Sequence, residues 1–228
     1  MLGQFHDLKQ LCEKLEKPLY NPQNDKPQCT WRPLCSVMLG IGGKLDKMDD
    51  VQAIIDYQIN KLGRIPGDSL LAELLPVPKM SSACVGPIPS RVLGIPDDID
   101  KYRQIVLRDR KRLLAYMLAK RFALGQDSPP RLIVGYGKGS WSDFEAIFQE
   151  VRQMLKEDGL MKYNDGPDPG MVHDRPLPPF RWAKMKGCLF MLTYHPTARH
   201  EFESMRFGTP VAKEIVNIYN EHFKGVTP

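Results

Sequence analysis

Three short apolar runs stand out in the pattern of hydrophobic and polar residues, and each ends in a turn-forming or polar segment. They cover Leu71–Leu75, Leu132–Gly135 and Leu189–Thr193. Short runs without polar alternation are typical of parallel strands that helices cover on both faces. We therefore expect the three runs to lie side by side as parallel strands, with the segments that follow them meeting at one edge of the sheet.

Apolar residues at helical spacing fill much of the chain between these runs. The pattern predicts helices over residues 5–17, 49–62, 100–124, 142–157 and 211–223. Two start signals support them, because Ser142–Glu145 has the sequence of a capping box and Thr209–Pro210 places a capping residue before a proline. The segment Ser36–Ile41 fits a degenerate strand or a helix, and the lack of alternation favours the helix. Residues 158–180 are rich in Gly, Pro and Asp, which predicts a loop.

Strands that alternate with helices predict an α/β fold, and specifically a three-layer α/β/α arrangement with a short, mainly parallel central sheet. A chain of 228 residues, 42% of them hydrophobic, can bury the core of one such domain. The sequence has neither an internal repeat nor a recognisable linker, so we expect residues 1–228 to form a single domain.

Net charge, cysteine content and the absence of targeting patterns exclude few classes of function. A formal net charge of +5 weakly favours an anionic partner, because many proteins with other functions are equally basic. The five cysteines contain no C-x-x-C pair, which argues against a zinc site and for reduced thiols. No leader pattern and no apolar run of membrane-spanning length is visible. We therefore expect an intracellular protein, cytoplasmic or nuclear, that does not associate with a membrane and binds no metal or cofactor. The oligomeric state stays open.

The segment from Thr193 to His200 carries the strongest chemical signal, because it directly follows an apolar run. Proline restricts the residue before it, so Pro196 should hold His195 in a rigid, extended conformation. At the carboxyl end of a buried strand such a side chain can reach a ligand. The alternative is a surface histidine in an ordinary loop between a strand and a helix, and His-Pro taken alone favours that alternative.

The second candidate is the glycine-rich loop Gly135–Ser140, between a predicted strand and a predicted helix. Small residues let backbone N–H groups approach an anion, which the positive end of a helix dipole also attracts. The loop lacks the spacing of a Walker motif, and Trp141 stands where the dinucleotide motif has its last glycine. The glycines fit a simple tight turn equally well.

Two further clusters have both a functional and a structural interpretation. The helix predicted over residues 100–124 carries eight Lys and Arg residues, which fits a phosphate-binding face or an ordinary solvated face. The acidic loop Tyr163–Arg175 lacks the regular spacing of a metal site, so we expect no metal there. The sequence contains no recognisable Ser/His/Asp set and no nucleophile elbow.

Taken together, three segments resemble the uracil-DNA glycosylase superfamily. They are the strand exit Leu74–Pro78, the strand and glycine loop Leu132–Gly137, and the terminal strand that ends in Thr193–Thr197. In that family a parallel sheet places three loops around a flipped base, and the last strand ends in His-Pro followed by a small residue. The resemblance covers about residues 70–223, which implies a glycosylase-like core preceded by a divergent helical part at residues 1–65.

The resemblance implies a role for each matching residue. The catalytic group would be His195, which would donate a hydrogen bond to the departing base. The base pocket would be lined by residues at the three strand ends, namely Pro76, Pro78, Gly135, Tyr136, Gly137, Tyr194 and Pro196. Contacts with the DNA backbone would come from Lys138, Ser140, Arg199 and His200.

The first motif of that family has no counterpart here. It is a strand followed by a loop that supplies a water-positioning carboxylate or amide. The one candidate strand is Ser36–Gly43, and Lys44–Asp46 follows it without the expected proline. We therefore expect a protein of the DNA-repair type that recognises a nucleic-acid base, with DNA as partner and hydrolytic base excision compromised. The alternatives are a non-enzymatic interaction protein that retains the fold, and an enzyme on a small nucleotide-like ligand at the Gly135 loop.

Overall fold

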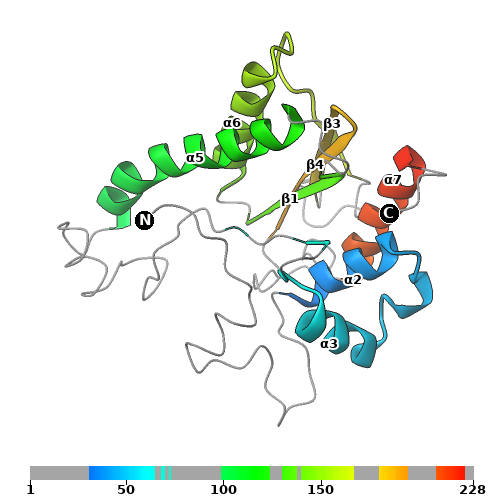
Figure 1. Ribbon diagram of the computed structural model, residues 1–228. Helices are drawn as coiled ribbons and strands as arrows, with labels where there is room; N and C mark the ends of the chain where they lie inside the picture. The colour runs from blue at the N-terminus through cyan, green and yellow to red at the C-terminus, as the bar shows by residue number, and fades with distance from the viewer. Residues whose placement is uncertain are drawn as a thin grey trace, which may run out of the picture.

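The computed structural model describes residues 31–64, 68–69, 72, 99–123, 130–137, 140–166, 180–194 and 209–223. These residues form helices around one small sheet (Figure 1). In chain order the elements are α2 (Arg32–Ile41), the 3₁₀ turn η2 (Leu45–Lys47), α3 (Val51–Asn60), α5 (Ile99–Ala123), β1 (Leu132–Tyr136), α6 (Trp141–Met154), β2 (Asn164–Asp165), β3 (Phe180–Met185), β4 (Cys188–Thr193) and α7 (Thr209–Phe223). The general α/β fold predicted from the sequence is confirmed.

The four strands of the sheet lie in the order β1-β4-β3-β2. β1 and β4 are parallel, in a register that runs from Leu132 opposite Leu189 to Tyr136 opposite Thr193. Two of the three predicted runs are therefore adjacent parallel strands, as expected. β3 is antiparallel to both β4 and β2, so the described sheet is mixed rather than mainly parallel. The third predicted run, Leu71–Leu75, lies almost wholly outside the described residues.

A hairpin of β3 and β4 produces the antiparallel pairing and corrects the prediction, which had no strand directly before β4. Its two-residue turn is Lys186–Gly187, and both residues have positive φ, 50° and 71°. Two successive positive φ angles are the mark of a type I′ turn, whose twist matches that of the flanking strands. The short strand β2 likewise lies inside the segment 158–180 that was predicted as a loop.

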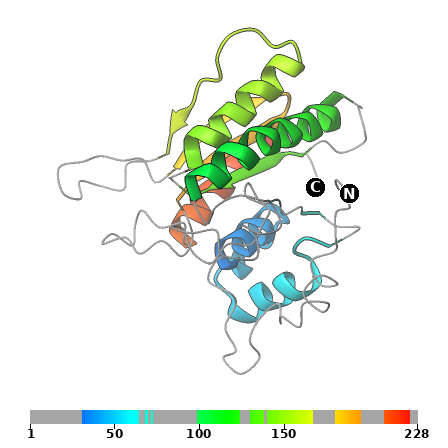
Figure 2. The same cartoon turned by 90° about the vertical axis from the view of Figure 1, so that its left-hand side faces the viewer.

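Helices pack against both faces of the sheet, and the side chains of β4 alternate between them. Leu189 and Met191 pack with α2 and α7, whereas Phe190 and Leu192 pack with α5 and α6. Figures 1 and 2 show α5 and α6 together on one side of the strands, and α2 and α7 on the other. We call these sides the α5/α6 face and the α2/α7 face. All six residues of β4 are buried, which explains why its apolar run is uninterrupted.

The ambiguous segment Ser36–Ile41 is helical and forms part of α2, as the lack of alternation indicated. Buried Ser36 donates a hydrogen bond from its hydroxyl to the Met48 carbonyl, at 2.7 Å. α2 approaches α7 closely at Gly40, where a Cβ would lie 2.7 Å from a methyl carbon of Val216 and 2.8 Å from the sulfur of Met48. The one candidate for the family's first strand is therefore a helix that packs on α7.

The predicted helices within the described residues are confirmed, but several of their ends differ from the prediction. α3 is shorter than the predicted range 49–62, and α7 begins at Thr209, which therefore lies inside the helix and not before it as a cap. α6 begins at Trp141, so Ser142 lies inside its first turn and the predicted capping box is wrong. The preceding turn sets this start, because the Ser140 amide donates to the Gly137 carbonyl at 2.9 Å. At the other end α6 stops at Met154, a few residues before the predicted end. The helix predicted nearest the N-terminus lies outside the described residues.

Candidate functional site

The carboxyl ends of β1 and β4 meet at one edge of the sheet, where both sequence candidates were expected. Tyr136 lies opposite Thr193, so the chain leaves both strands at the same level. The Thr193 carbonyl accepts two hydrogen bonds, from the Gly137 amide at 2.9 Å and from the Trp141 indole N–H at 2.8 Å. One backbone oxygen of β4 therefore fixes both the turn after β1 and the start of α6.

The turn after β1 is held by its own backbone. Gly137 has a φ of +102°, which L side chains rarely adopt, and no described atom lies within 4 Å of the place where its Cβ would be. Its amide donates to Thr193, and its carbonyl accepts from the Ser140 amide. Two amides of the loop are thus used inside the protein. The anion-binding interpretation then depends on Lys138 and Gly139, which lie outside the described residues.

Gly135 faces the interior of the protein. It is buried, and a Cβ there would lie 2.7 Å from the ring of Phe144 and 3.1 Å from a methyl carbon of Leu192. The missing side chain is what lets α6 pack directly on β1. The neighbouring Tyr136 is half-buried against the core of the α2/α7 face. Gly135 and Tyr136 therefore pack β1 against the cores of both faces just before the strand ends.

Tyr194 anchors the chain just before the His-Pro segment. Its side chain is only 2% exposed, and its ring meets the Trp141 ring edge-on, with 5.5 Å between centroids and 65° between planes. The buried Thr193 donates its hydroxyl hydrogen to the Tyr194 carbonyl at 3.3 Å. The segment that begins with His195 therefore leaves the sheet from a fixed starting point.

Twelve site residues were predicted, and the structure describes five of them. These five lie together at or just beneath the edge, and they are Gly135, Tyr136, Gly137, Ser140 and Tyr194. The remaining seven lie outside the described residues, and they are Pro76, Pro78, Lys138, His195, Pro196, Arg199 and His200. Sequence reasoning missed Trp141 as the residue that joins the two strand ends. The available signal was its indole N–H, which needs a partner when the ring is covered.

Charged side chains around α6 are paired with one another. Lys111 of α5 and Asp143 of α6 form an ion pair at 3.1 Å. Arg181 of β3 contacts Glu145 at 3.2 Å and Asp165 at 3.0 Å. Asp165 belongs to the acidic loop considered above as a metal site, and it pairs with an arginine instead. Within the described residues no group of three potential ligands could hold a metal ion.

Burial raises the pKa of four thiol and phenol groups among the described residues, which stay protonated at neutral pH. Burial raises the pKa of the Cys35 thiol to about 12 and that of Cys188 well above its usual value. Burial also raises the pKa of Tyr57, to which a 2.7 Å hydrogen bond from its hydroxyl to Asp68 adds. The pKa of Tyr163 is raised chiefly by burial as well. None of these groups is poised as a nucleophile or a general base.

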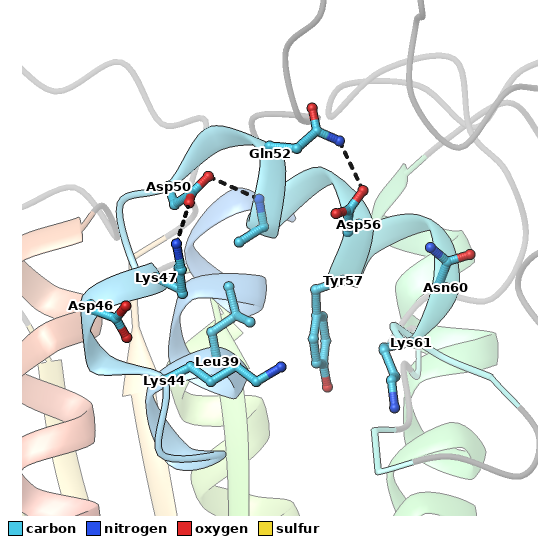
Figure 3. A pocket seen from close by; sticks show the side chains of 11 residues that line it. Leu39, Lys44, Asp46, Lys47, Asp50, Gln52, Asp56, Tyr57, Asn60 and Lys61 are labelled. Atoms are coloured by element: carbon cyan, nitrogen blue, oxygen red, sulfur yellow. Dashed lines mark hydrogen bonds and ion pairs between the residues drawn. The ribbon is translucent and has the colours of Figure 1, made fainter.

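A cavity of about 680 Å³ lies along η2 and α3 (Figure 3). Much of its polar lining is already paired. Asp50 accepts hydrogen bonds from Lys47 at 3.1 Å and from the Ala53 amide at 3.1 Å, and Gln52 donates to Asp56 at 2.9 Å. Because acidic and basic side chains alternate around it, the cavity favours no single ligand class. No motif marks these residues, which is why sequence reasoning did not find the cavity.

No helix among the described residues has the length and apolar character needed to cross a membrane. Comparisons of the chain with protein-family models, with curated proteins and with solved structures found no match. The arrangement of the strand ends is therefore the basis for assigning a function.

Proposed function

We propose that the protein recognises a base in DNA, and that the edge formed by β1 and β4 carries the recognition site. The observation that supports this proposal is the Thr193 carbonyl, which joins the glycine turn to the strand that leads into His195. Two segments that the resemblance assigns to one base pocket therefore start from neighbouring positions. Parallel strands that end at one edge are the usual setting for a ligand site in α/β proteins.

The proposal includes a three-layer arrangement of the uracil-DNA glycosylase type. The packing of helices on both faces of the sheet supports it. β1 lies at one end of the described sheet, so its outer edge has no partner strand among the described residues. The predicted run Leu71–Leu75 would occupy that edge and bring the third loop to the same end of the sheet.

The chemistry expected at this edge is recognition with weak or no excision. The His195 side chain would donate to the base and stabilise negative charge on it. Excision also needs a group that orients water or stabilises the sugar cation. In the family a loop after the first strand supplies this group, but the candidate strand is the helix α2, which Gly40 packs against α7, and the 3₁₀ turn η2 follows it. The site of action would be inside the cell, where DNA is available.

Fluorescence anisotropy with a panel of labelled duplexes tests the proposal. The panel holds four duplexes of one sequence, which contain uracil, hypoxanthine, a mismatch or an unmodified base pair at one position. Each duplex is measured over a range of salt concentrations. We expect one altered base to bind several-fold more tightly than the unmodified duplex, with affinity that falls as salt rises. Equal affinity for every duplex would contradict base recognition. Thermal stabilisation by a free nucleotide without DNA binding would favour the small-ligand alternative, and the absence of both would favour an interaction protein.

Replacement of His195 by Ala tests the chemistry of the site. Any measurable excision should fall by roughly 10²–10³, because a preorganised donor to the leaving group is lost. Affinity for the unmodified duplex should change little, since contacts with phosphates dominate it. Arg199→Ala should show the reverse, with weaker and less salt-dependent binding and an unchanged chemical step.

His6→Ala is the matched control, because it removes a histidine that the proposal leaves out. If the wild-type protein cleaves nothing at high concentration, the readout becomes the preference for the altered base. His195→Ala should abolish that preference. An unchanged preference and an unchanged cleavage rate would exclude His195 from the site.

A further inference from the structure

α5 concentrates the positive charge of the protein. Its eight Lys and Arg residues and two Asp residues give Ile99–Ala123 a formal charge of +6, against +5 for the whole chain. All other residues together therefore sum to −1. Figure 2 shows the helix running across the outside of the α5/α6 face. Charge concentrated in this way creates a strongly positive surface.

Six of the exposed side chains of α5 form one line along the helix, which we call the basic stripe. Its members recur every three or four residues and so share a helix face, and they are Lys101, Ile105, Arg108, Arg112, Tyr116 and Lys120. Tyr116 is 55% exposed and lies between cations on both sides. At the rise of an α-helix the stripe is about 28 Å long, which is enough for several nucleotides.

The opposite side of α5 is fixed in the core. Ala115 and Ala119 are buried in the cluster that α5 forms with α6 and β4. Lys111, which lies beside the stripe, pairs with Asp143 of α6 at 3.1 Å. The helix is therefore held in place through its inner face, and among the described residues the stripe does not contribute to that packing.

Three cations of the stripe, Arg108, Arg112 and Lys120, are not needed to hold the described residues together. Arg112 and Lys120 form no ion pair with any described residue. Arg108 contacts the adjacent Asp109 at 3.0 Å, but both side chains are largely exposed, and such pairs contribute little to stability. Their charge is available to a partner.

We propose that the basic stripe binds single-stranded nucleic acid, with phosphates on Arg108, Arg112 and Lys120 and an unpaired base stacked on Tyr116. Complementary charge selects a polyanion. An exposed aromatic ring between cations selects an unpaired base, because that base has a free face for stacking. The stripe shares no residue with the site at the edge formed by β1 and β4, so the inference stands even if base recognition fails there.

Fluorescence anisotropy of the full chain tests the phosphate contacts. The probe is a labelled single strand of about 20 nucleotides, long enough for one such site, with the matching duplex measured beside it. R108Q/R112Q should weaken single-strand binding about tenfold or more at low salt and reduce the salt slope by about 1.4, which corresponds to two phosphates. K44Q/K162Q removes the same charge at exposed positions outside the stripe, and its effect should stay below about twofold. Equal effects of the two double variants would overturn the proposal.

The stacking contact has its own test at Tyr116. Tyr116→Ala should weaken single-strand binding roughly five- to hundredfold without changing the salt slope. Tyr116→Phe keeps the ring and should bind like the wild type. Since all of these positions are exposed, the variants should melt at the wild-type temperature. Wild-type affinity in Tyr116→Ala would overturn the proposal.

Anionic vesicles of phosphatidylcholine and phosphatidylserine distinguish nucleic acid from a lipid surface. Tighter binding to these vesicles than to the single strand would overturn the inference. Single-strand binding that depends on the stripe, without preference for any altered base, would contradict the proposed function and support the stripe. An altered-base preference that persists in R108Q/R112Q, with no change in single-strand affinity, would support the proposed function and contradict the stripe.

Discussion

On each face of the sheet a glycine lets two elements pack closely together, but the side chains that the two glycines contact differ. A Cβ at Gly40 on the α2/α7 face would lie 2.7 Å from Val216, and one at Gly135 on the α5/α6 face would lie 2.7 Å from Phe144. Val216 is fully buried and, as a β-branched residue, has little freedom to rotate. The Phe144 ring is only half-buried. Equally close contacts should therefore resist substitution unequally.

The cores behind the two glycines are similar in composition. Aromatic rings contribute to both cores, with Phe148 and Phe190 at 4.7 Å on the α5/α6 face and Tyr219 and Phe223 at 4.7 Å on the α2/α7 face. What differs is the side chain that faces each glycine, which is a fully buried one at Gly40 and a half-buried one at Gly135. We infer from this difference that the α2/α7 face is the more rigid of the two. The predictions below test this difference.

Gly40→Ala should have the largest effect. The new methyl group collides with Val216, and the resulting overpacking outweighs the roughly 1 kcal/mol that Ala contributes to helix propensity. We expect the free energy of unfolding to fall by about 2 kcal/mol, measured by chemical denaturation. In a double-mutant cycle Val216→Ala should cost less in the Gly40→Ala background than alone. Strictly additive effects would show that the two residues do not clash.

The pH dependence of stability probes the buried thiol of α2. Burial raises the pKa of Cys35 from 9.0 to about 12, so the folded state keeps a proton that the unfolded state loses. This contribution to stability is complete below pH 9 and is lost as the pH rises toward 12. At pH 10 the loss from this thiol is about 1.4 kcal/mol.

Cys35→Ala should flatten the decline in unfolding free energy between pH 8 and pH 10 by about that amount. The slope is the readout, because the substitution also removes buried volume and lowers stability at every pH. A decline as steep as that of the wild type would mean that the thiol does not stay protonated in the fold. Reducing agent throughout keeps disulfide formation from contributing.

Gly135→Ala should have the smallest of these effects, about 1 kcal/mol, because the Phe144 ring can tilt toward solvent. Phe144→Leu should recover much of that loss when the two changes are combined. Denaturation midpoints of the four proteins in this cycle give the comparison directly. A loss larger than that of Gly40→Ala would reverse the assignment of the rigid face.

The strands differ in whether they could be predicted from the sequence alone. β1 and β4 were predictable because helices cover both of their faces, which leaves uninterrupted apolar runs. β3 was missed because Arg181 and Lys184 break its pattern. Both charged side chains find partners on distant elements. Arg181 forms an ion pair with Glu145 of α6, and the Lys184 ammonium lies over the Phe223 ring at 5.7 Å. Such distant partners cannot be identified from local sequence.

The candidate site shows a similar limit. Gly135 and Gly137 look alike in the sequence, but one admits α6 and the other supplies a positive φ. The difference depends on where α6 packs, which no local pattern encodes. The predicted helix start at Ser142 failed for a related reason, because the turn at Gly137 places the helix start earlier. The strand ends themselves, which determine where the site lies, were predictable.

The hydrogen bonds to the Thr193 carbonyl also bear on how such a protein can evolve. Both donors, the Gly137 amide and the Trp141 indole, precede β4 in the chain, and the acceptor is the last residue of that strand. A sequence change between Tyr194 and the start of α7 therefore removes none of these partners. Descendants of this chain could exchange that one segment, and with it the ligand, while inheriting the scaffold intact.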